Sequence, residues 1–380
     1  MSAGLLEHIA DKRIVICVGS GGVGKTTLAA AIALGAAIAG RKTLVLTIDP
    51  ARRLANSLGL EELDNTETRI PAAVFSAAKI KPQGELWGMM LDVKRTFDEL
   101  IKRIAPTDDA AERILENHYY QNLSDALAGS QEYMAMEKLH EVQAERDYDL
   151  IVVDTPPTKH ALDFLEAPAR MEDFLNGKVI QWFLKPYMVA GKVGAAFAQR
   201  SAAMTFKMLE RFTGYEAMAD LAEFFLAFDG MYEGFKERAR HVKELLAAED
   251  TAFVLVTSPA SPAIEEAEFF YTRLTRDRMR PLAVVFNRVH VWEGGENGEF
   301  ADALVGAGEK LIAKLPAYAP AIDAVIDNAA GMIQMAAADK KAVERFLEKT
   351  QHGREAFRIP AFATDVHDLQ SLAELGAFLI

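Results

Sequence analysis

Cysteine is almost absent from this chain: among 380 residues there is one, Cys17. A single thiol cannot form a disulfide within the chain, and it cannot supply the several thiolates of a structural zinc or iron–sulfur site. A chain without internal disulfides fits a reducing compartment. We therefore expect a cytoplasmic protein.

Positive charge and long hydrophobic runs are also scarce. Lys and Arg number 42 against 55 Asp and Glu, a net charge of −13, which argues against nucleic acid or an anionic lipid surface as the main partner. The longest apolar stretch is shorter than the ~20 residues of a membrane span, and the N-terminus lacks the basic and apolar regions of a secretory signal. The sequence thus predicts a soluble protein, and its 50% hydrophobic residues suffice for a large core.

The most informative stretch is residues 18–27, VGSGGVGKTT, which matches the pattern G-x-x-x-x-G-K-[ST]. It lies between an apolar segment, residues 13–18, and an Ala-rich segment, residues 28–39, which we expect to be a buried strand and a helix. Glycines let such a loop curl until its N–H groups point inward, and the helix N-terminus adds a positive dipole end. This context predicts a phosphate-binding loop formed by Gly21, Gly22, Val23, Gly24, Lys25, Thr26 and Thr27.

Each polar side chain of the loop has an expected role. Lys25 is expected along the β- and γ-phosphates, the Thr26 hydroxyl on Mg²⁺, and Thr27 at the α-phosphate. The expected cofactors are therefore ATP and Mg²⁺.

Two aspartates follow predicted buried strands. Residues 42–48 run into Asp49, which suits a group that orients the attacking water or, alternatively, a helix N-cap. Residues 150–153 run into Asp154, a Walker-B pattern whose carboxylate holds Mg²⁺, usually through water. Since both strands should end beside the phosphate loop, we expect the two carboxylates to flank one site.

A further strand, residues 282–286, leads into Asn287-Arg288-Val289-His290. A guanine-specific site would place Lys after the Asn and an Asp two positions later, and neither is present here. We therefore favour adenine, with the Asn287 amide facing the base edge.

The rest of the chain predicts an α/β fold of the P-loop NTPase type, with a mostly parallel central sheet flanked by helices and an inserted α-helical subdomain. We expect one domain, residues 1–380, with a core of 12–84, 146–166, 250–290 and 356–380 and helical inserts at 85–145 and 167–249. A third strand is expected at 73–78, another strand at 251–257, a short edge strand or loop at 357–362, and helices at 262–276, 298–314, 319–350 and 367–378.

The second insert is rich in methionine and aromatic residues. One stripe has helical spacing of three and four: Met218, Leu221, Phe225, Phe228, Tyr232 and Phe235. Such a stripe is typical either of the core of a helical subdomain or of a pliable groove for an apolar helix. Both interpretations stay open at this point.

The phosphate loop, TIDPARRL, VVDTPPTKHALDFL, FVLVTSPA, VVFNRV and RIPAFATDVHDLQSL together resemble, in order and spacing, the ArsA family of ATPases. That family includes the arsenite-pump ATPase and the targeting factor for tail-anchored membrane proteins. The resemblance implies an ATP-gated homodimer and a helical subdomain, residues 85–128 and 167–249, that handles a hydrophobic helix or membrane-protein cargo. It also implies a catalytic Asp49, a switch segment opening at Asp154, an adenine contact at Asn287 and a base-covering loop from Pro360.

The chain departs from the family pattern at Ser20, where the family usually has a lysine that reaches the partner's nucleotide. Either Arg52, Arg53 or Lys159 neutralises the transition-state charge instead, or hydrolysis is slow, or the dimer is arranged differently. The zinc-clamping C-x-x-C pair is missing, and arsenite, which demands several thiolates, has no site.

We therefore expect an Mg²⁺-dependent ATPase that acts as a dimeric switch on a hydrophobic partner. One alternative is an ATP-gated regulatory or scaffold protein with negligible turnover. Another is a small-molecule ligase or kinase of the P-loop group, which the long apolar inserts disfavour.

Overall fold

The computed structural model describes residues 4–49, 52–123, 130–156, 232–279, 281–292, 299–350 and 356–380. Several expectations fall outside the described residues: the insert from 167 to 231, the stripe from Met218 to Phe228, and Lys159.

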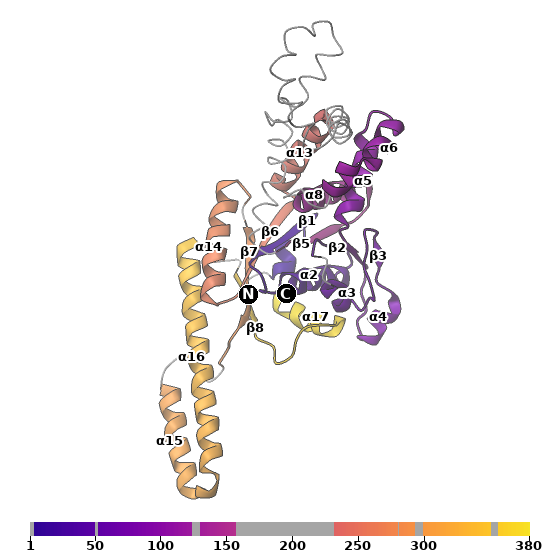
Figure 1. Ribbon diagram of the computed structural model, residues 1–380. Helices are drawn as coiled ribbons and strands as arrows, with labels where there is room; N and C mark the ends of the chain where they lie inside the picture. Colours follow the sequence, from indigo (N-terminus) through magenta and orange to yellow (C-terminus); the bar gives the residue numbers. More distant parts are fainter. Residues whose placement is uncertain are drawn as a thin grey trace, which may run out of the picture.

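The described chain is built on an eight-stranded sheet in the order β3-β4-β2-β5-β1-β6-β7-β8 (Figure 1). Every neighbouring pair is parallel except β3 with β4. The strands are β1 Ile14–Gly19, β2 Lys42–Thr47, β3 Thr68–Arg69, β4 Glu85–Met90, β5 Leu150–Asp154, β6 Thr251–Thr257, β7 Pro281–Val289 and β8 Ala356–Pro360. The mostly parallel α/β sheet predicted from the sequence is confirmed.

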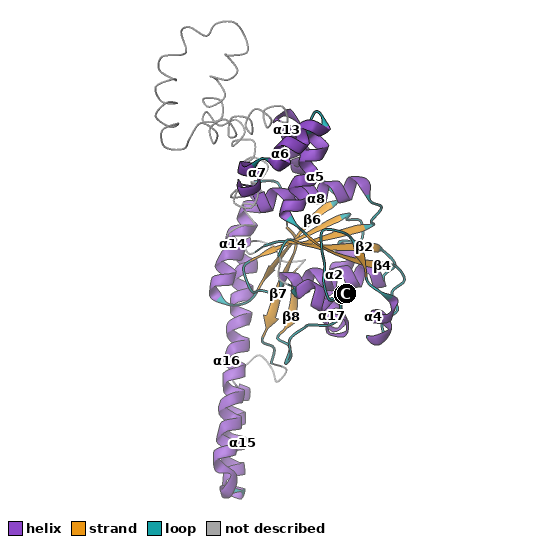
Figure 2. Cartoon of the chain, turned by 45° about the vertical axis from the view of Figure 1, so that its right-hand side comes forward, coloured by secondary structure: helices purple, strands orange, loops and turns teal. Residues whose placement is uncertain are grey.

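Helices cover both faces of this sheet (Figure 2). They are α1 Leu5–His8, α2 Lys25–Ile38, α3 Arg53–Ser57, α4 Ala72–Ala77, α5 Val93–Ile104, α6 Asp108–Glu116, α7 His118–Leu123, α8 Ser130–Glu145, α13 Tyr232–Ala247, α14 Ser261–Arg276, α15 Glu299–Lys314, α16 Ala319–Thr350 and α17 Leu369–Gly376, with short 3₁₀ turns Pro316–Tyr318 and Ala377–Leu379. None of the described helices is both long and apolar enough for a membrane crossing.

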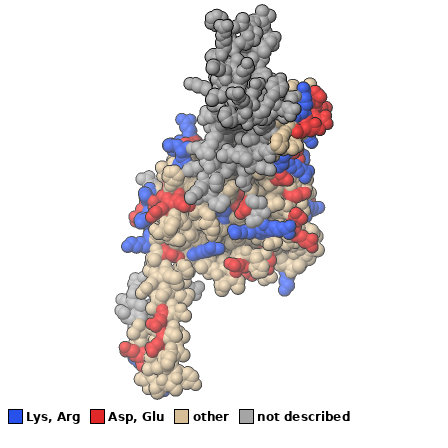
Figure 3. All heavy atoms as spheres, in the orientation of Figure 1, with Lys and Arg blue, Asp and Glu red and all other residues tan. Residues whose placement is uncertain are grey.

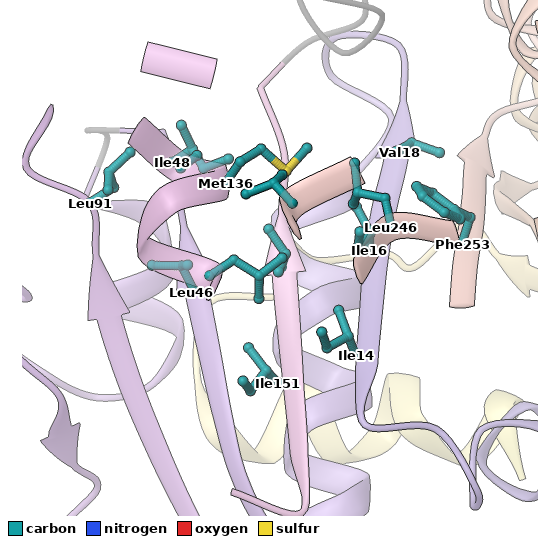
Figure 4. Packing of buried hydrophobic residues seen from close by; sticks show 14 of the residues in the cluster. Ile14, Ile16, Val18, Leu46, Ile48, Leu91, Met136, Ile151, Leu246 and Phe253 are labelled. Carbon is teal, nitrogen blue, oxygen red and sulfur yellow. The ribbon is translucent and has the colours of Figure 1, made fainter. Parts of the chain in front are cut away.

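The central strands are mostly apolar because both of their faces are buried. Along β1, Ile14, Ile16 and Val18 face one core and Val15 and Cys17 the other, as the two-residue period of a strand requires. Figure 4 shows the first core, where these side chains meet residues of β2 and β5 and helical residues such as Met136 and Leu246. The second core is formed with α2 and α17.

Two expectations about the edge of the sheet were wrong. Residues 73–77 belong to helix α4, Ala72–Ala77, whose only buried residue is Phe75, and Ala78 is its C-cap. The third long strand is β4, which we expected to be helical from residue 85; it pairs with β2 along its whole length. In a run as short as ELWGMM, the spacing of the apolar residues fits both the 3.6-residue period of a helix and the two-residue period of a strand. Pairing with β2 makes this segment a strand. The first helical insert therefore begins at α5.

The later elements confirm the sequence expectations closely. Helices α14, α15 and α16 match 262–276, 298–314 and 319–350, and of the two alternatives for residues 357–362, edge strand or loop, the structure has the strand β8. The C-terminal half of α16 packs on the sheet through Val343 and Phe346, both buried. Its N-terminal half runs beside α15 away from the core, so the two helices form a projecting hairpin (Figure 1).

Candidate nucleotide-binding site

The phosphate loop joins β1 to α2 at the carboxyl edge of the sheet. Strand β1 ends at Gly19 and α2 begins at Lys25, so the free N–H groups of the helix N-terminus face the loop. Gly24 has φ +95°, a left-handed conformation that suits glycine. A side chain there is also excluded by contact, because its Cβ would lie 2.4 Å from Nδ2 of Asn287.

Lys25 is buried within this loop. Its Nζ donates a hydrogen bond to the backbone carbonyl of Ser20 at 2.9 Å. Burial lowers the pKa of Lys25, and the nearby carboxylates of Asp154 and Asp49 oppose that change. A buried cation beside inward-facing N–H groups is a strong anion site, because the low local dielectric increases its attraction for phosphate.

Asp154 lies at the end of β5 with two hydroxyl groups on one of its oxygens. Thr26 Oγ1 donates to Asp154 Oδ2 at 2.7 Å, and Thr47 Oγ1 donates to the same oxygen at 2.9 Å. The other oxygen, Oδ1, is buried and has no partner within the described part of the chain. Burial raises the pKa of Asp154 to about 6, although both hydroxyl bonds favour the ionised form.

This donor set fits a magnesium ion. The Thr26 hydroxyl and the Asp154 carboxylate, one of whose oxygens has no partner within the described residues, are hard ligands of the kind that Mg²⁺ takes, together with waters and phosphate oxygens. Among the described residues no group of three or more His, Cys, Asp or Glu side chains lies together. Thr26 and Asp154 would therefore need further ligands from the nucleotide and from water to hold the metal. This is expected for a site where the metal binds together with the nucleotide.

A pocket of about 720 Å³ opens over the loop, a volume suited to a nucleotide. Its lining comes from the phosphate loop and the start of α2, the segments after β2 and β5, helix α3, the end of β7, and the segment from the end of β8 into α17. Of the predicted site residues, the structure brings together Gly22, Gly24, Lys25, Thr26, Thr27, Asp49 and Asn287 in its walls.

Pro360 does not line the pocket itself. It is the last residue of β8, and the segment that follows, including Ala361 and Phe362, forms one wall. Gly21 and Val23 belong to the loop without lining the pocket. The role of a base-covering segment at this position stays a prediction.

Asn287 is bound to the phosphate loop. Its Nδ2 donates to the carbonyl of Val23 at 2.8 Å, and its Oδ1 accepts from the N–H of Arg288 at 3.0 Å. The side chain is buried, so these bonds form away from water. Asn287 thus ties the end of β7 to the loop, a structural role that the sequence did not suggest, while its contact with adenine remains untested.

Two further residues of the site were missed from the sequence. The Thr47 hydroxyl accepts a hydrogen bond from the backbone N–H of Asp49 at 3.2 Å and donates one to the side chain of Asp154. This single hydroxyl therefore links the ends of β2 and β5, where the two predicted site aspartates lie. Arg288 has φ +60°, unusual for a residue other than glycine, and its Nη1 lies 3.3 Å from the carbonyl of Gly22. Their positions in the sequence could have indicated both residues. Thr47 precedes the predicted site residue Asp49 by two positions, and Arg288 directly follows the predicted site residue Asn287.

The position of Ser20 bears on the missing lysine. Ser20 is buried, and its hydroxyl has no hydrogen-bond partner within the described residues. Of the cations considered as substitutes, Arg53 lines the nucleotide pocket, whereas Arg52 lines a separate small pocket beside it. Arg288, which was not considered, also lines the nucleotide pocket.

A parallel sheet with a glycine-rich loop between β1 and α2, a buried lysine and a strand-end aspartate bound to the loop threonine defines a P-loop nucleoside triphosphatase. The family follows from comparison with known proteins. A family model for ArsA, described as anion-transporting ATPase, matches residues 12–315. The chain belongs to this family and is an ATPase.

Individual relatives agree with this assignment. The chain is 24% identical over 80% of its length to putative arsenical pump-driving ATPase 1 of Aquifex aeolicus, covering 71% of that protein. It is 25% identical over 75% of its length to ATPase GET3 of Malassezia globosa, covering 76% of it. A 32% identical match to a putative arsenical pump-driving ATPase of Halobacterium salinarum spans 45% of this chain and only 26% of that relative.

Proposed function

We propose that the chain hydrolyses ATP in an Mg²⁺-dependent reaction at this pocket and uses the cycle as a conformational switch. The observation that carries the proposal is the Thr26–Asp154 hydrogen bond beside buried Lys25, with one carboxylate oxygen left unpaired. An unpaired buried oxygen is costly in isolation, and a cation would compensate for it.

In the proposed reaction, the loop N–H groups and Lys25 hold the β- and γ-phosphates, and Asp49 orients the water that attacks the γ-phosphate. Mg²⁺, when bound, neutralises charge on the phosphate oxygens. Thr47 fixes the positions of both aspartates, since its hydroxyl bonds the Asp154 side chain and the Asp49 backbone. Thr155 Oγ1 donates to the carbonyl of Cys17 at 2.7 Å and anchors the start of the segment that would respond to γ-phosphate loss.

In this proposal, an arginine that lines the nucleotide pocket takes over the role of the lysine that the family usually has at the position of Ser20. Arg53 and Arg288 both line it, and either guanidinium could stabilise charge on the transferring phosphoryl group. Their presence supports turnover despite Ser20.

We further propose that the switch is a homodimer that works in the cytoplasm on a hydrophobic helix or membrane-protein partner. The methionine-rich second insert of the sequence supports an apolar partner, because unbranched thioether side chains adapt to varied surfaces. Arsenite is not proposed as a ligand. The single cysteine is fully buried in β1, and burial raises the pKa of its thiol.

The test is the variant Asp49→Asn. It is expected to bind Mg-ATP with nearly unchanged affinity and to lower steady-state phosphate release by about 100-fold or more, since the amide cannot orient water as the carboxylate does. Thermal melting with and without nucleotide controls for folding. Retained turnover would remove Asp49 from its proposed role.

A second candidate, an ATP-gated scaffold with negligible turnover, is favoured only by Ser20. Phosphate release measured beside ATP-dependent dimerisation separates the two. Dimerisation without release in the unmodified protein would favour the scaffold.

A further inference from the structure

His290 joins the wall of the nucleotide pocket to helix α16. Its backbone N–H and its ring nitrogen Nδ1 each lie 2.8 Å from the same carboxylate oxygen, Oδ2 of Asp339. The His290 ring lines the nucleotide pocket, whereas Asp339 does not. The side chain of Asp339 is only 16% exposed and that of His290 is 43% exposed. The ring is therefore held on its Nδ1 side by a residue outside the pocket, and the rest of the ring is available to a ligand.

The contact with Asp339 determines which ring nitrogen of His290 carries the proton. A carboxylate oxygen only accepts hydrogen bonds, so in the neutral ring the proton lies on Nδ1 and is donated to Asp339. The other nitrogen, Nε2, then carries a lone pair and no proton. Among the residues that the structure describes, Nε2 has no hydrogen-bond partner. His290 thus offers the pocket a hydrogen-bond acceptor.

The register of the sheet places His290 beside the segment that follows β8. Val289, the last residue of β7, pairs with Pro360, the last residue of β8. The N–H of Ala361 donates to the carbonyl of Val289 at 2.9 Å, which keeps the two chain segments together past the ends of the strands. The residues that come next on each side, His290 and Phe362, both line the pocket. They form one wall.

This wall lies beyond the part of β7 that contacts the phosphate loop. Asn287 Nδ2 donates to the carbonyl of Val23, and Arg288 Nη1 lies 3.3 Å from the carbonyl of Gly22. His290 follows these two residues in the chain and makes no contact of this kind with the loop. A nucleotide whose phosphates fill the loop has its nucleoside outside the loop, and His290 lies on that side of the pocket.

Phe362 gives the same wall an aromatic surface. Its side chain is 36% exposed, and its ring meets the ring of Phe378 at a centroid distance of 5.9 Å and an interplanar angle of 80°. A partly exposed aromatic ring stabilises a nucleic acid base by stacking, which a ribose or a phosphate cannot match. The combination of an aromatic ring and an acceptor nitrogen on one wall therefore favours the base as the group that His290 meets.

We propose that His290 selects adenine, with Nε2 accepting a hydrogen bond from the 6-amino group, and that Asp339 is the positioning residue that fixes this tautomer. Adenine carries an amino donor at position 6 of the purine, whereas guanine carries a carbonyl acceptor there. The lone pair on Nε2 attracts the amino hydrogen and repels the carbonyl oxygen. The inference rests on the proposed function in that the pocket must bind ATP, and it names the residues that distinguish the base.

Calorimetric titration with Mg-ATP and Mg-ITP measures this selection, because ITP has a carbonyl in place of the 6-amino group and a proton on N1. Titration at about pH 8.5, well above the ~6.5 of free imidazole, keeps histidine rings neutral. The unmodified full-length chain is expected to bind ATP at least about tenfold more tightly than ITP. Equal affinities would overturn the proposal.

His290→Phe tests the acceptor itself. Phenylalanine keeps a ring of similar size but has no nitrogen, so ATP loses its partner while stacking and phosphate contacts are kept. The ratio of ATP affinity to ITP affinity is expected to fall at least about fivefold, mainly through weaker ATP binding. Thermal melting without nucleotide controls for folding. An unchanged ratio would overturn the proposal.

Asp339→Leu separates positioning from packing. Without the carboxylate the ring is free to carry its proton on Nε2, where it becomes a donor. ATP is therefore expected to bind about threefold or more weakly and ITP about threefold or more tightly, whereas a loss of packing alone would weaken both. Weakening of both nucleotides together, or an unchanged ratio, would overturn the proposal.

Asp327→Leu is the matched control, because it removes an exposed carboxylate from the same helix outside the pocket. Charged side chains are few on the face of the hairpin that Figure 3 shows, so this change disturbs few other charges. The ratio is expected to stay within about twofold. Hydrolysis does not enter these titrations, so failure of the selection leaves the proposed ATPase switch standing. A chain that binds neither nucleotide would instead overturn the proposed function as well.

Discussion

Substituting Asn287 with leucine separates the observed contact of this residue with the phosphate loop from its proposed contact with the base. Leucine has nearly the same size but removes the amide, so both bonds are lost: Nδ2 to the Val23 carbonyl at 2.8 Å and Oδ1 to the Arg288 N–H at 3.0 Å. The substitution also leaves the Val23 carbonyl without its amide partner on a loop that must hold phosphate.

The size of the effect follows from these two bonds. A neutral buried hydrogen bond contributes about 1 kcal/mol, and an acceptor left unpaired costs about 1–3 kcal/mol. If this free-energy cost destabilises the ordered, binding-competent conformation of the loop, the affinity for Mg-ATP drops by about 5- to 150-fold. Because the loop is proposed to hold phosphate and not base, the same factor is expected for ATP, GTP and inorganic tripolyphosphate.

Calorimetric titration of Asn287→Leu with these three ligands measures the factor, and thermal melting shows how much of the cost falls on folding. Asn287→Asp keeps the acceptor for Arg288 and loses the donor to Val23, so it should weaken all three ligands as well. Asn56→Leu, an exposed position in the same pocket, controls for a changed lining and should leave tripolyphosphate binding within about twofold. Unchanged tripolyphosphate affinity in Asn287→Leu, with weakened ATP, would refute the loop-closing role and leave only base contact.

Three other predictions concern single side chains. Lys25→Ala should abolish measurable Mg-ATP binding in calorimetry while the circular dichroism spectrum is kept; retained binding would contradict the site. Thr47→Val should lower phosphate release about 10-fold or more, with a smaller change in ATP affinity, because Asp154 and Asp49 lose their shared hydroxyl; unchanged release would contradict this. Burial lowers the pKa of His140 below its usual 6.5, so its neutral form is favoured on folding, and the resulting stability is present above pH 6.5 and lost as pH falls from there through the lowered pKa. His140→Leu should therefore flatten the melting temperature against pH over roughly pH 8 to 5, and an unchanged slope would speak against it.

The position of the glycine-rich loop between a strand and a helix was predictable because its pattern is local. Glycines, Lys25 and Thr26 occupy consecutive positions between a strand and a helix, and the loop needs only that order to form. Asp49 and Asp154 were predictable almost as well. Each ends a buried parallel strand, and β2 and β5 are neighbours in the sheet.

The edge of the sheet was less predictable. The segment Ala72–Ala77 and the strand Glu85–Met90 are both short and partly apolar, so their periods do not distinguish helix from strand. Only the position of β2, with its hydrogen-bonding edge open to β4, decides which segment enters the sheet.

The sequence by itself determined that a glycine-rich loop containing Lys25 lies between a first strand and its following helix, and that two later strands each end in an aspartate, because those features depend on residues adjacent in the chain. Only the tertiary structure decided that Asn287 donates a hydrogen bond to Val23, 264 positions earlier in the chain, and that Thr47 bonds both Asp154 and Asp49. It also decided that the hairpin of α15 and α16 projects away from the sheet. These features depend on which strands become neighbours and on where a helix extends beyond the sheet. Contacts between residues far apart in the chain cannot be derived from the local sequence pattern.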